Sequence, residues 1–164
     1  MKQTSFITLA VLAIGFLLYL NFAPKKEPGF SHRIILTDKA PPPIGPYEQA
    51  VLTGNTLFVS GQIALNPDGA FDTSSIENEF KQVAKNISAI LEAAKMDICD
   101  VVSVRVYMTD LKKFKELNDV YMNSFRCADN GGFKPGNVYP ARETVQVSAL
   151  PKGAHIEISV VAVR

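Results

Sequence analysis

The apolar residues of this chain follow one pattern at the N-terminus and another through the rest of the sequence. No charged residue occurs from Gln3 to Pro24, and residues 6–20 (FITLAVLAIGFLLYL) are almost continuously apolar. A signal-peptide core has about 7–15 apolar residues and a membrane-spanning helix about 20, so this stretch lies between the two. The pattern predicts an N-terminal hydrophobic helix in residues 1–23, either a transmembrane anchor that contacts the membrane through residues 6–23 or a signal segment.

The residues that follow this predicted helix bear on whether it is cleaved, on where the folded domain begins and on the expected localisation. Asn21-Phe22-Ala23 is a weak cleavage site with Pro24 directly after it, which favours an uncleaved anchor over a removed signal. Residues 24–32 (PKKEPGFSH) form a polar linker with two prolines and a glycine, and the folded domain is predicted at 33–164. We expect a membrane-anchored or exported protein, with the cytosol as the alternative and the side of the membrane left open.

Alternating patterns after the linker predict β-strands joined in part by hairpins. Gly54-Asn55 is a dipeptide typical of tight turns, and β-rich segments flank it on both sides. The last two strands are expected to form a second hairpin around Leu150-Pro-Lys-Gly153. The predicted strands are 33–37, 49–52, 56–60, 101–108, 143–147 and 156–163.

Two segments show the spacing of three and four residues that is typical of amphipathic helices. The first runs from Ile76 to Ala94, and Ser74 and Glu77 form a capping box at its start. The second is expected to begin after Asp110 as its N-cap. Its apolar stripe consists of Leu111, Phe114, Leu117, Tyr121 and Phe125. This order of elements predicts an α+β fold, a mixed β-sheet with two helices on one face.

The alternation within two strands predicts what each face of the sheet meets. The residues of 101–108 that are expected to share one face are Val102, Val104, Val106 and Met108. The last strand is largely apolar on both faces. One face carries Ile156, Ile158, Val160 and Ala162. The other carries Glu157, Ser159, Val161 and Val163. Because the helices cover only one face, the second apolar face predicts contact with another subunit.

Composition and charge narrow the functional classes. Hydrophobic residues make up 47% and charged residues 20% of the 164 residues, as in ordinary globular proteins. Residues 1–32 hold three lysines and one glutamate, so 17 basic and 16 acidic residues in the whole chain become 14 and 15 in the domain, a charge of −1. No nucleic acid is therefore expected as a partner. Cys99 and Cys127 belong to no metal or redox motif and no nucleotide-binding motif occurs, so neither metal nor cofactor is expected.

Glu157 and Arg142 are the strongest candidates for chemistry. Glu157 shares its strand face with Val161, and partial burial there would raise the carboxyl pKa and let it hold or activate a water molecule. Arg142 stands at the entry of a strand with Thr144 on the same side, where a guanidinium fork suits a small carboxylate substrate. The Arg142 guanidinium and the Glu157 carboxylate would lie close together if both side chains point to the same face of the predicted sheet. The alternative for Glu157 is an exposed acid paired with a lysine, and the alternative for Arg142 is a solvated surface residue.

Other polar residues stand where they could line a binding site. Tyr47 lies at a junction of loop and strand, and its hydroxyl could reach a ligand or simply pack. Ser60-Gly61 ends a strand, where the glycine would let a ligand approach backbone N–H groups. Asn118 and Tyr121 share a helix face, for which core packing or a helix surface is the alternative.

Five short motifs together carry a family resemblance. They are Ile44-Gly-Pro-Tyr47, Val59-Ser-Gly-Gln62, Asn118-Asp-Val-Tyr121, Pro140-Ala-Arg-Glu-Thr-Val145, and Leu150-Pro-Lys-Gly153 followed by Ile156-Glu-Ile158. In this order and spacing they make residues 33–164 resemble the RidA (YjgF/YER057c/UK114) family. The resemblance implies a chorismate-mutase-like fold, a homotrimer with sites between subunits, and cofactor-free hydrolysis of 2-imino and enamine acids, such as 2-iminopropionate, to 2-oxo acids and ammonia.

The same resemblance implies a role for each candidate residue. Arg142 would clamp the substrate carboxylate, and Glu157 would position the attacking water. Backbone N–H groups near Gly61 and Thr144 would assist the clamp. The residues implied to line the pocket are Tyr47, Ser60 and Asn118.

Two departures from the family pattern keep other functions open. Thr144 stands where archetypal deaminases have cysteine, and the loop from Phe125 to Pro140 is longer than usual and leads into Arg142. A non-catalytic, trimeric small-carboxylate-binding or chaperone-like module is therefore the alternative function. RNA cleavage or translation inhibition has also been attached to the family, and the domain charge of −1 disfavours it.

Overall fold

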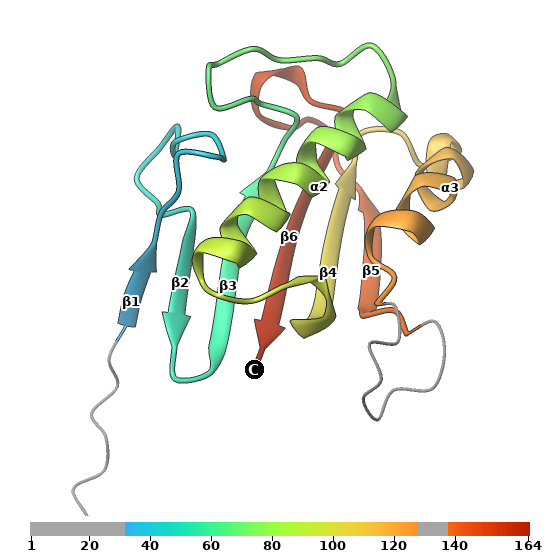
Figure 1. The fold of residues 1–164 in the computed structure, drawn as a ribbon. Coiled ribbons are helices and arrows are strands. Elements are labelled where there is room, and N and C mark those ends of the chain that lie inside the picture. Colours follow the sequence, from blue (N-terminus) through green and yellow to red (C-terminus); the bar gives the residue numbers. More distant parts are fainter. Residues whose placement is uncertain (1–31, 128–137) are drawn as a thin grey trace, which may run out of the picture. The chain divides into compact units, whose positions relative to one another are not determined.

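The computed structural model describes residues 32–127 and 138–164. In these ranges six strands form one sheet in the order β1-β2-β3-β6-β4-β5 (Figure 1). The strands are β1 (His32–Ile35), β2 (Ala50–Thr53), β3 (Thr56–Gln62), β4 (Val101–Met108), β5 (Ala141–Gln146) and β6 (Ile156–Val163). Only β4 and β5 are parallel neighbours, so the sheet is mixed as predicted. The predicted N-terminal helix, residues 1–23, lies outside the described residues, as does the linker up to residue 31.

Two helices, α2 (Ile76–Ala93) and α3 (Phe114–Ser124), cover one face of this sheet (Figure 1). The N-cap of α2 is Ser75 rather than Ser74, because Ser75 Oγ accepts the backbone N–H of Asn78 at 3.1 Å. Asp110 caps a single turn, η2 (Leu111–Lys113), by accepting the N–H of Lys112, and α3 begins only after that turn. Both predicted helices are therefore present: the first begins at Ile76 as predicted, with its cap one residue later than expected, and the second begins one turn later than predicted.

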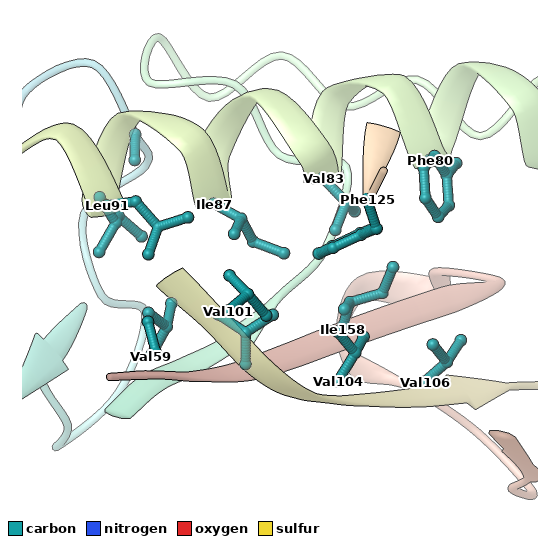
Figure 2. Packing of buried hydrophobic residues seen from close by; sticks show 14 of the residues in the cluster. Val59, Phe80, Val83, Ile87, Leu91, Val101, Val104, Val106, Phe125 and Ile158 are labelled. Carbon is teal, nitrogen blue, oxygen red and sulfur yellow. The ribbon is translucent and has the colours of Figure 1, made fainter. Parts of the chain in front are cut away.

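The core lies between α2, α3 and the sheet. Figure 2 shows Phe80, Val83 and Ile87 of α2 above Val104 and Ile158 of the sheet, all of them 0% exposed. Burying each such side chain contributes about 1.5–3 kcal/mol to folding. The three-and-four spacing of the α2 sequence thus sets which side of the helix meets the sheet.

The expected hairpin of the last two strands is wrong. β6 lies between β3 and β4 and is antiparallel to both, whereas β5 is parallel to β4 at the edge of the sheet. The side chains explain this arrangement. β6 is apolar on both faces and suits the centre of the sheet, whereas ARETVQ in β5 is polar and half-exposed and suits an edge.

One residue of β4 also departs from its expected face. Val104, Val106 and Met108 are buried, but Val102 is 48% exposed. The register of β4 against β6 shifts between Val101 and Ser103, and such a bulge turns the following side chain to the other face. The face without helices also exposes Phe58 and Val145. The predicted contact with another subunit stays a prediction.

Cys99 and Cys127 form a disulfide, which their spacing did not indicate. Their Cα atoms are 4.9 Å apart across a sequence separation of 28 residues. Cys99 lies in the turn η1 (Ile98–Asp100) before β4, and Cys127 follows α3. The disulfide thus joins the turn before β4 to the end of α3. The Cys127 N–H also donates to the carbonyl of Val138, and this hydrogen bond joins the end of α3 to the segment that enters β5.

Candidate functional site

Glu157 lies in a cleft on the face of the sheet without helices. Its neighbours in β6, Ile156 and Ile158, are 0% exposed in the core, so the alternation points Glu157 to the opposite face. The cleft there has a volume of about 220 Å³. It is lined by Ile44, Tyr47, Ser60, Gly61, Ile63, Pro151 and Glu157. The structure therefore brings four sequence-predicted residues, Tyr47, Ser60, Gly61 and Glu157, into one cleft.

Gly61 creates the space that the Glu157 carboxyl group occupies. A methyl group at Gly61 would overlap Glu157 Oε1 and stand 2.7 Å from Glu157 Cδ. The pairing of β3 with β6 is irregular between Val59 and Gln62, a bulge that lets the backbone of Gly61 meet this side chain. Any larger residue at this position would have to displace the end of the Glu157 side chain.

Burial raises the pKa of Glu157 above its usual value. The carboxyl group is half-buried, and in the described ranges no lysine, arginine or histidine forms an ion pair with it. Desolvation without a cation disfavours the charged form and makes the ionised carboxylate a stronger base. This group can accept a proton from a water molecule held in the cleft.

Hydrogen bonds hold the other wall of the cleft in place. Ser60 Oγ donates to the carbonyl of Glu48 at 2.6 Å, so its hydroxyl proton is already used to fix the segment that carries Tyr47. Gln49 is 2% exposed, and its Nε2 donates to the carbonyls of Ala40 and Pro41. Tyr47 is left 44% exposed at the mouth of the cleft.

Arg142 lies on the other face, against α3. Its Nη2 donates to Asn118 Oδ1 at 2.7 Å, and its Cζ stands 4.4 Å from the ring centre of Tyr121 and 5.4 Å from that of Phe114. In the described part of the chain, no acidic side chain forms an ion pair with Arg142. Two rings and an amide thus hold the guanidinium, and its charge is available for an anion.

The structure does not bring Arg142 and Glu157 together within one copy of the chain. Arg142 is in register with Val104, which is buried under the helices, whereas Glu157 is in register with Tyr107. The two side chains therefore point to opposite faces of the sheet. Thr144 lies on the Arg142 side, and its buried hydroxyl has no hydrogen-bond partner among the described residues. The predicted site is divided into an Arg142 half, with Asn118 and Thr144, and a Glu157 half.

Sequence reasoning missed Glu79, which is 0% exposed. Its carboxylate accepts the backbone N–H groups of His155 and Ile156 at 2.9 and 3.3 Å and contacts His155 Nδ1 at 2.5 Å. These contacts fix His155 and Ile156, at the start of β6 and directly before Glu157. The available signal was a charged residue on the apolar stripe of the helix, three positions after Ile76.

Among the described residues, no group of three His, Cys, Asp or Glu side chains is placed to hold a metal ion. The fold and these half-sites define a small α+β domain with an arginine held by two rings and an amide on one face of its sheet and a cleft lined by a carboxylate on the other.

The family model described as Endoribonuclease L-PSP matches residues 37–164. The chain belongs to this family, which is the RidA (YjgF/YER057c/UK114) family that the motifs resemble. A RutC family protein of Aquifex aeolicus is 45% identical over 132 residues, which cover 80% of this chain and 99% of that protein. The human 2-iminobutanoate/2-iminopropanoate deaminase is 41% identical over 133 residues, which cover 80% of this chain and 90% of that protein.

Solved structures agree with this assignment. The crystal structure of E. coli TdcF with bound serine matches with a TM-score of 0.69 at 34% identity, over 80% of this chain and 98% of that one. The crystal structure of RidA from the Antarctic bacterium Psychrobacter sp. PAMC 21119 matches with a TM-score of 0.70 at 39% identity, over 80% and 99%. The six-stranded sheet with two helices is thus the fold of solved family members.

These matches correct the expected localisation, membrane-anchored or exported. The family match begins at residue 37, and the human deaminase matches over 90% of its own length. Neither helix in ranges 32–127 and 138–164 combines the length and the apolar composition needed to cross a membrane. The expectation of membrane contact through residues 6–23 rested on the sequence pattern alone, and it is withdrawn together with the localisation.

Proposed function

We propose that this protein hydrolyses reactive 2-imino and enamine acids, such as 2-iminopropionate, to 2-oxo acids and ammonia. The observation that carries this proposal is the half-buried Glu157, which lies in the cleft, has a raised pKa and forms no ion pair in the described residues. Such a carboxylate is unfavourable for stability and useful for moving a proton. The name of the human relative supports the same chemistry.

Arg142 fits the role of carboxylate clamp. Asn118 takes one of its N–H groups, and the remaining N–H groups can bind both oxygens of a small carboxylate as a fork. A charge-assisted contact of this kind contributes about 1.5–3 kcal/mol. It would select 2-imino acids over neutral imines.

The proposed reaction uses one water molecule and involves no oxidation. As the water oxygen bonds to the electrophilic carbon of the C=N group, Glu157 accepts a water proton and the imine nitrogen takes up one proton. The resulting carbinolamine then loses its C–N bond. Glu157 returns its proton to the departing nitrogen, and the carbinolamine hydroxyl releases its proton to solvent, which replaces the proton that the imine nitrogen took from solvent in the first step. The products are the 2-oxo acid and ammonia.

We further propose that the active form is a homotrimer of the domain at 33–164, with Arg142 of one copy and Glu157 of the next in one shared cleft. The opposite orientation of the two side chains within a copy supports this arrangement. The face that carries Glu157 also exposes Phe58 and Val145, which a neighbouring copy would cover.

The remaining candidates take supporting roles in this proposal. Tyr47 closes the mouth of the cleft, and Gly61 gives the carboxylate its place and the ligand access to the backbone. Ser60 holds the Tyr47 segment through Glu48. Asn118 orients Arg142, and Thr144 offers its backbone N–H to the substrate carboxylate.

The test is hydrolysis of an imine generated in place. An amino-acid oxidase supplies 2-iminopropionate or 2-iminobutanoate, and release of the 2-oxo acid and ammonia is followed with and without the full-length protein. Accelerated release by the wild type, lost in Arg142→Ala and Glu157→Gln, supports the proposal. A wild-type rate equal to that of water alone contradicts it.

The competing candidate is a non-catalytic small-carboxylate-binding or chaperone-like module. Thr144, in place of the cysteine of archetypal deaminases, is the feature that favours it. Calorimetric titration of the same samples with 2-oxobutyrate separates the two functions. Binding without accelerated hydrolysis favours the module, and binding with acceleration favours the deaminase.

A further inference from the structure

One face of α3 is shaped to hold the Arg142 guanidinium. Phe114, Asn118 and Tyr121 stand at positions i, i+4 and i+7 of the helix, so their side chains line the same face. Asn118 accepts one N–H at 2.7 Å, and the two rings stand 5.4 and 4.4 Å from Arg142 Cζ. Both distances lie within the roughly 6 Å over which a ring face attracts a cation.

The Tyr121 ring is the more firmly held of the two rings. It is 5% exposed, stacks on Phe125 with ring centres 4.8 Å apart, and meets Phe80 edge-on at 6.1 Å. Phe114, in contrast, is 39% exposed. A packed ring keeps its position, so the guanidinium that lies over it keeps its direction.

The hydroxyl group of Tyr121 does not explain why a tyrosine is buried here. It has no hydrogen-bond partner among the described residues. Burial raises the pKa of Tyr121 to about 12, so the phenol is neutral at physiological pH and adds no charge of its own to the attraction. The function of this residue therefore resides in its ring.

We propose that Tyr121 is a positioning residue that fixes the Arg142 fork for the substrate carboxylate, with Phe114 as the second, weaker support. This inference rests on the proposed function, in which Arg142 is the clamp. An arginine held in its binding geometry loses less side-chain freedom when the carboxylate arrives, and this saving appears as affinity. Tyr121 acts through Arg142 and has no contact with the reacting carbon.

Three variants separate positioning from packing. Tyr121→Leu removes the ring, and we expect the Kd for 2-oxobutyrate and the KM for the imine to rise about tenfold, with kcat changed less than about twofold. Tyr121→Phe keeps the ring and loses only the unpartnered hydroxyl, so Kd and KM stay at wild-type values. Leu91→Ala is the matched control, because Leu91 is 0% exposed in the same core and lies at the end of α2 away from Phe125 (Figure 2). It lowers the Tm and leaves KM unchanged.

The outcomes distinguish this inference from the proposed function. A wild type with neither binding nor turnover contradicts both. A wild type that binds and turns over, with a Tyr121→Leu variant of unchanged Kd, contradicts only the positioning role. Equal increases of KM in Tyr121→Leu and Leu91→Ala also contradict it, because packing alone would then explain the effect. If Tyr121→Leu fails to fold, Phe114→Leu at the exposed ring gives the test, with about a threefold rise in Kd expected and no rise contradicting the inference.

Discussion

The two half-sites place an ionisable side chain without an ion-pair partner among the described residues in opposite environments, one around Glu157 and the other around Arg142. Glu157 lies against the backbone of Gly61 in an apolar cleft, where burial raises its pKa. Arg142 rests on the faces of Phe114 and Tyr121 with an amide at its edge, an environment that suits a cation. The environment of Glu157 destabilises the ionised carboxylate and makes it a stronger base, whereas the environment of Arg142 stabilises the guanidinium cation and fixes its position. In the proposed function Glu157 transfers a proton and Arg142 is the clamp, and these two environments, on the two faces of one sheet, support those roles.

The largest expected effect lies in the Glu157 half. Glu157→Gln keeps the shape of the side chain but removes the proton acceptor, so we expect kcat to fall about 100-fold or more, with the Kd for 2-oxobutyrate nearly unchanged. Because burial disfavours the charged form, this variant should also unfold at a higher temperature at neutral pH. Glu116→Gln, on the exposed side of α3, is the control. Unchanged turnover in Glu157→Gln would exclude this residue as the base.

The corresponding change in the Arg142 half should act on binding. Arg142→Ala removes the charge-assisted fork, and we expect the Kd for 2-oxobutyrate to rise about 10- to 100-fold. Arg33→Ala, on exposed β1, serves as the control and should bind like the wild type. An Arg142→Ala variant with a lower kcat and an unchanged Kd would contradict the assignment of Arg142 to substrate binding.

Gly61→Ala tests how closely the Glu157 half is packed. The added methyl overlaps the Glu157 carboxyl group and displaces the end of this flexible side chain, so we expect the free energy of unfolding to fall by about 1 kcal/mol. Shortening the acid in Glu157→Ala removes the overlapping atoms. The double variant should therefore lose less stability than the two single changes added together, as measured by urea unfolding. Strict additivity would show that the two residues do not meet.

The smallest expected effect is a shift in the pH dependence of kcat and of stability, which comes from the Glu157 half alone. Because burial raises the pKa of Glu157, the acid limb of kcat should have its midpoint above about 4.3, the ordinary value for glutamate. The folded state also binds this proton more tightly than the unfolded state. Relative to Glu157→Gln, the wild type should therefore gain stability as the pH falls from the raised pKa to the ordinary one. A midpoint at or below the ordinary value contradicts the desolvated cleft.

The sequence pattern predicted local features well and long-range placement less well. Alternation in β6 revealed its two apolar faces, and the spacing in α2 revealed its buried stripe. Strand order depends on pairings between distant segments, so the expected hairpin of β5 and β6 was wrong. The separation of Arg142 from Glu157 follows from register against β4, which neither local sequence contains. The Cys99–Cys127 bridge likewise depends on the fold, because the spacing of the two cysteines matches no motif.

The central claim is that each functioning site takes Arg142 from one copy and Glu157 from another, and subunit mixing tests it directly. Arg142→Ala and Glu157→Gln, each with little activity alone at substrate concentrations below the wild-type KM, are unfolded together and refolded as a one-to-one mixture. Random assembly pairs an intact arginine half with an intact glutamate half at about one site in four. We predict recovery of about a quarter of the wild-type activity. Activity that stays at the level of the separate variants, although native mass spectrometry shows mixed oligomers, would contradict the claim.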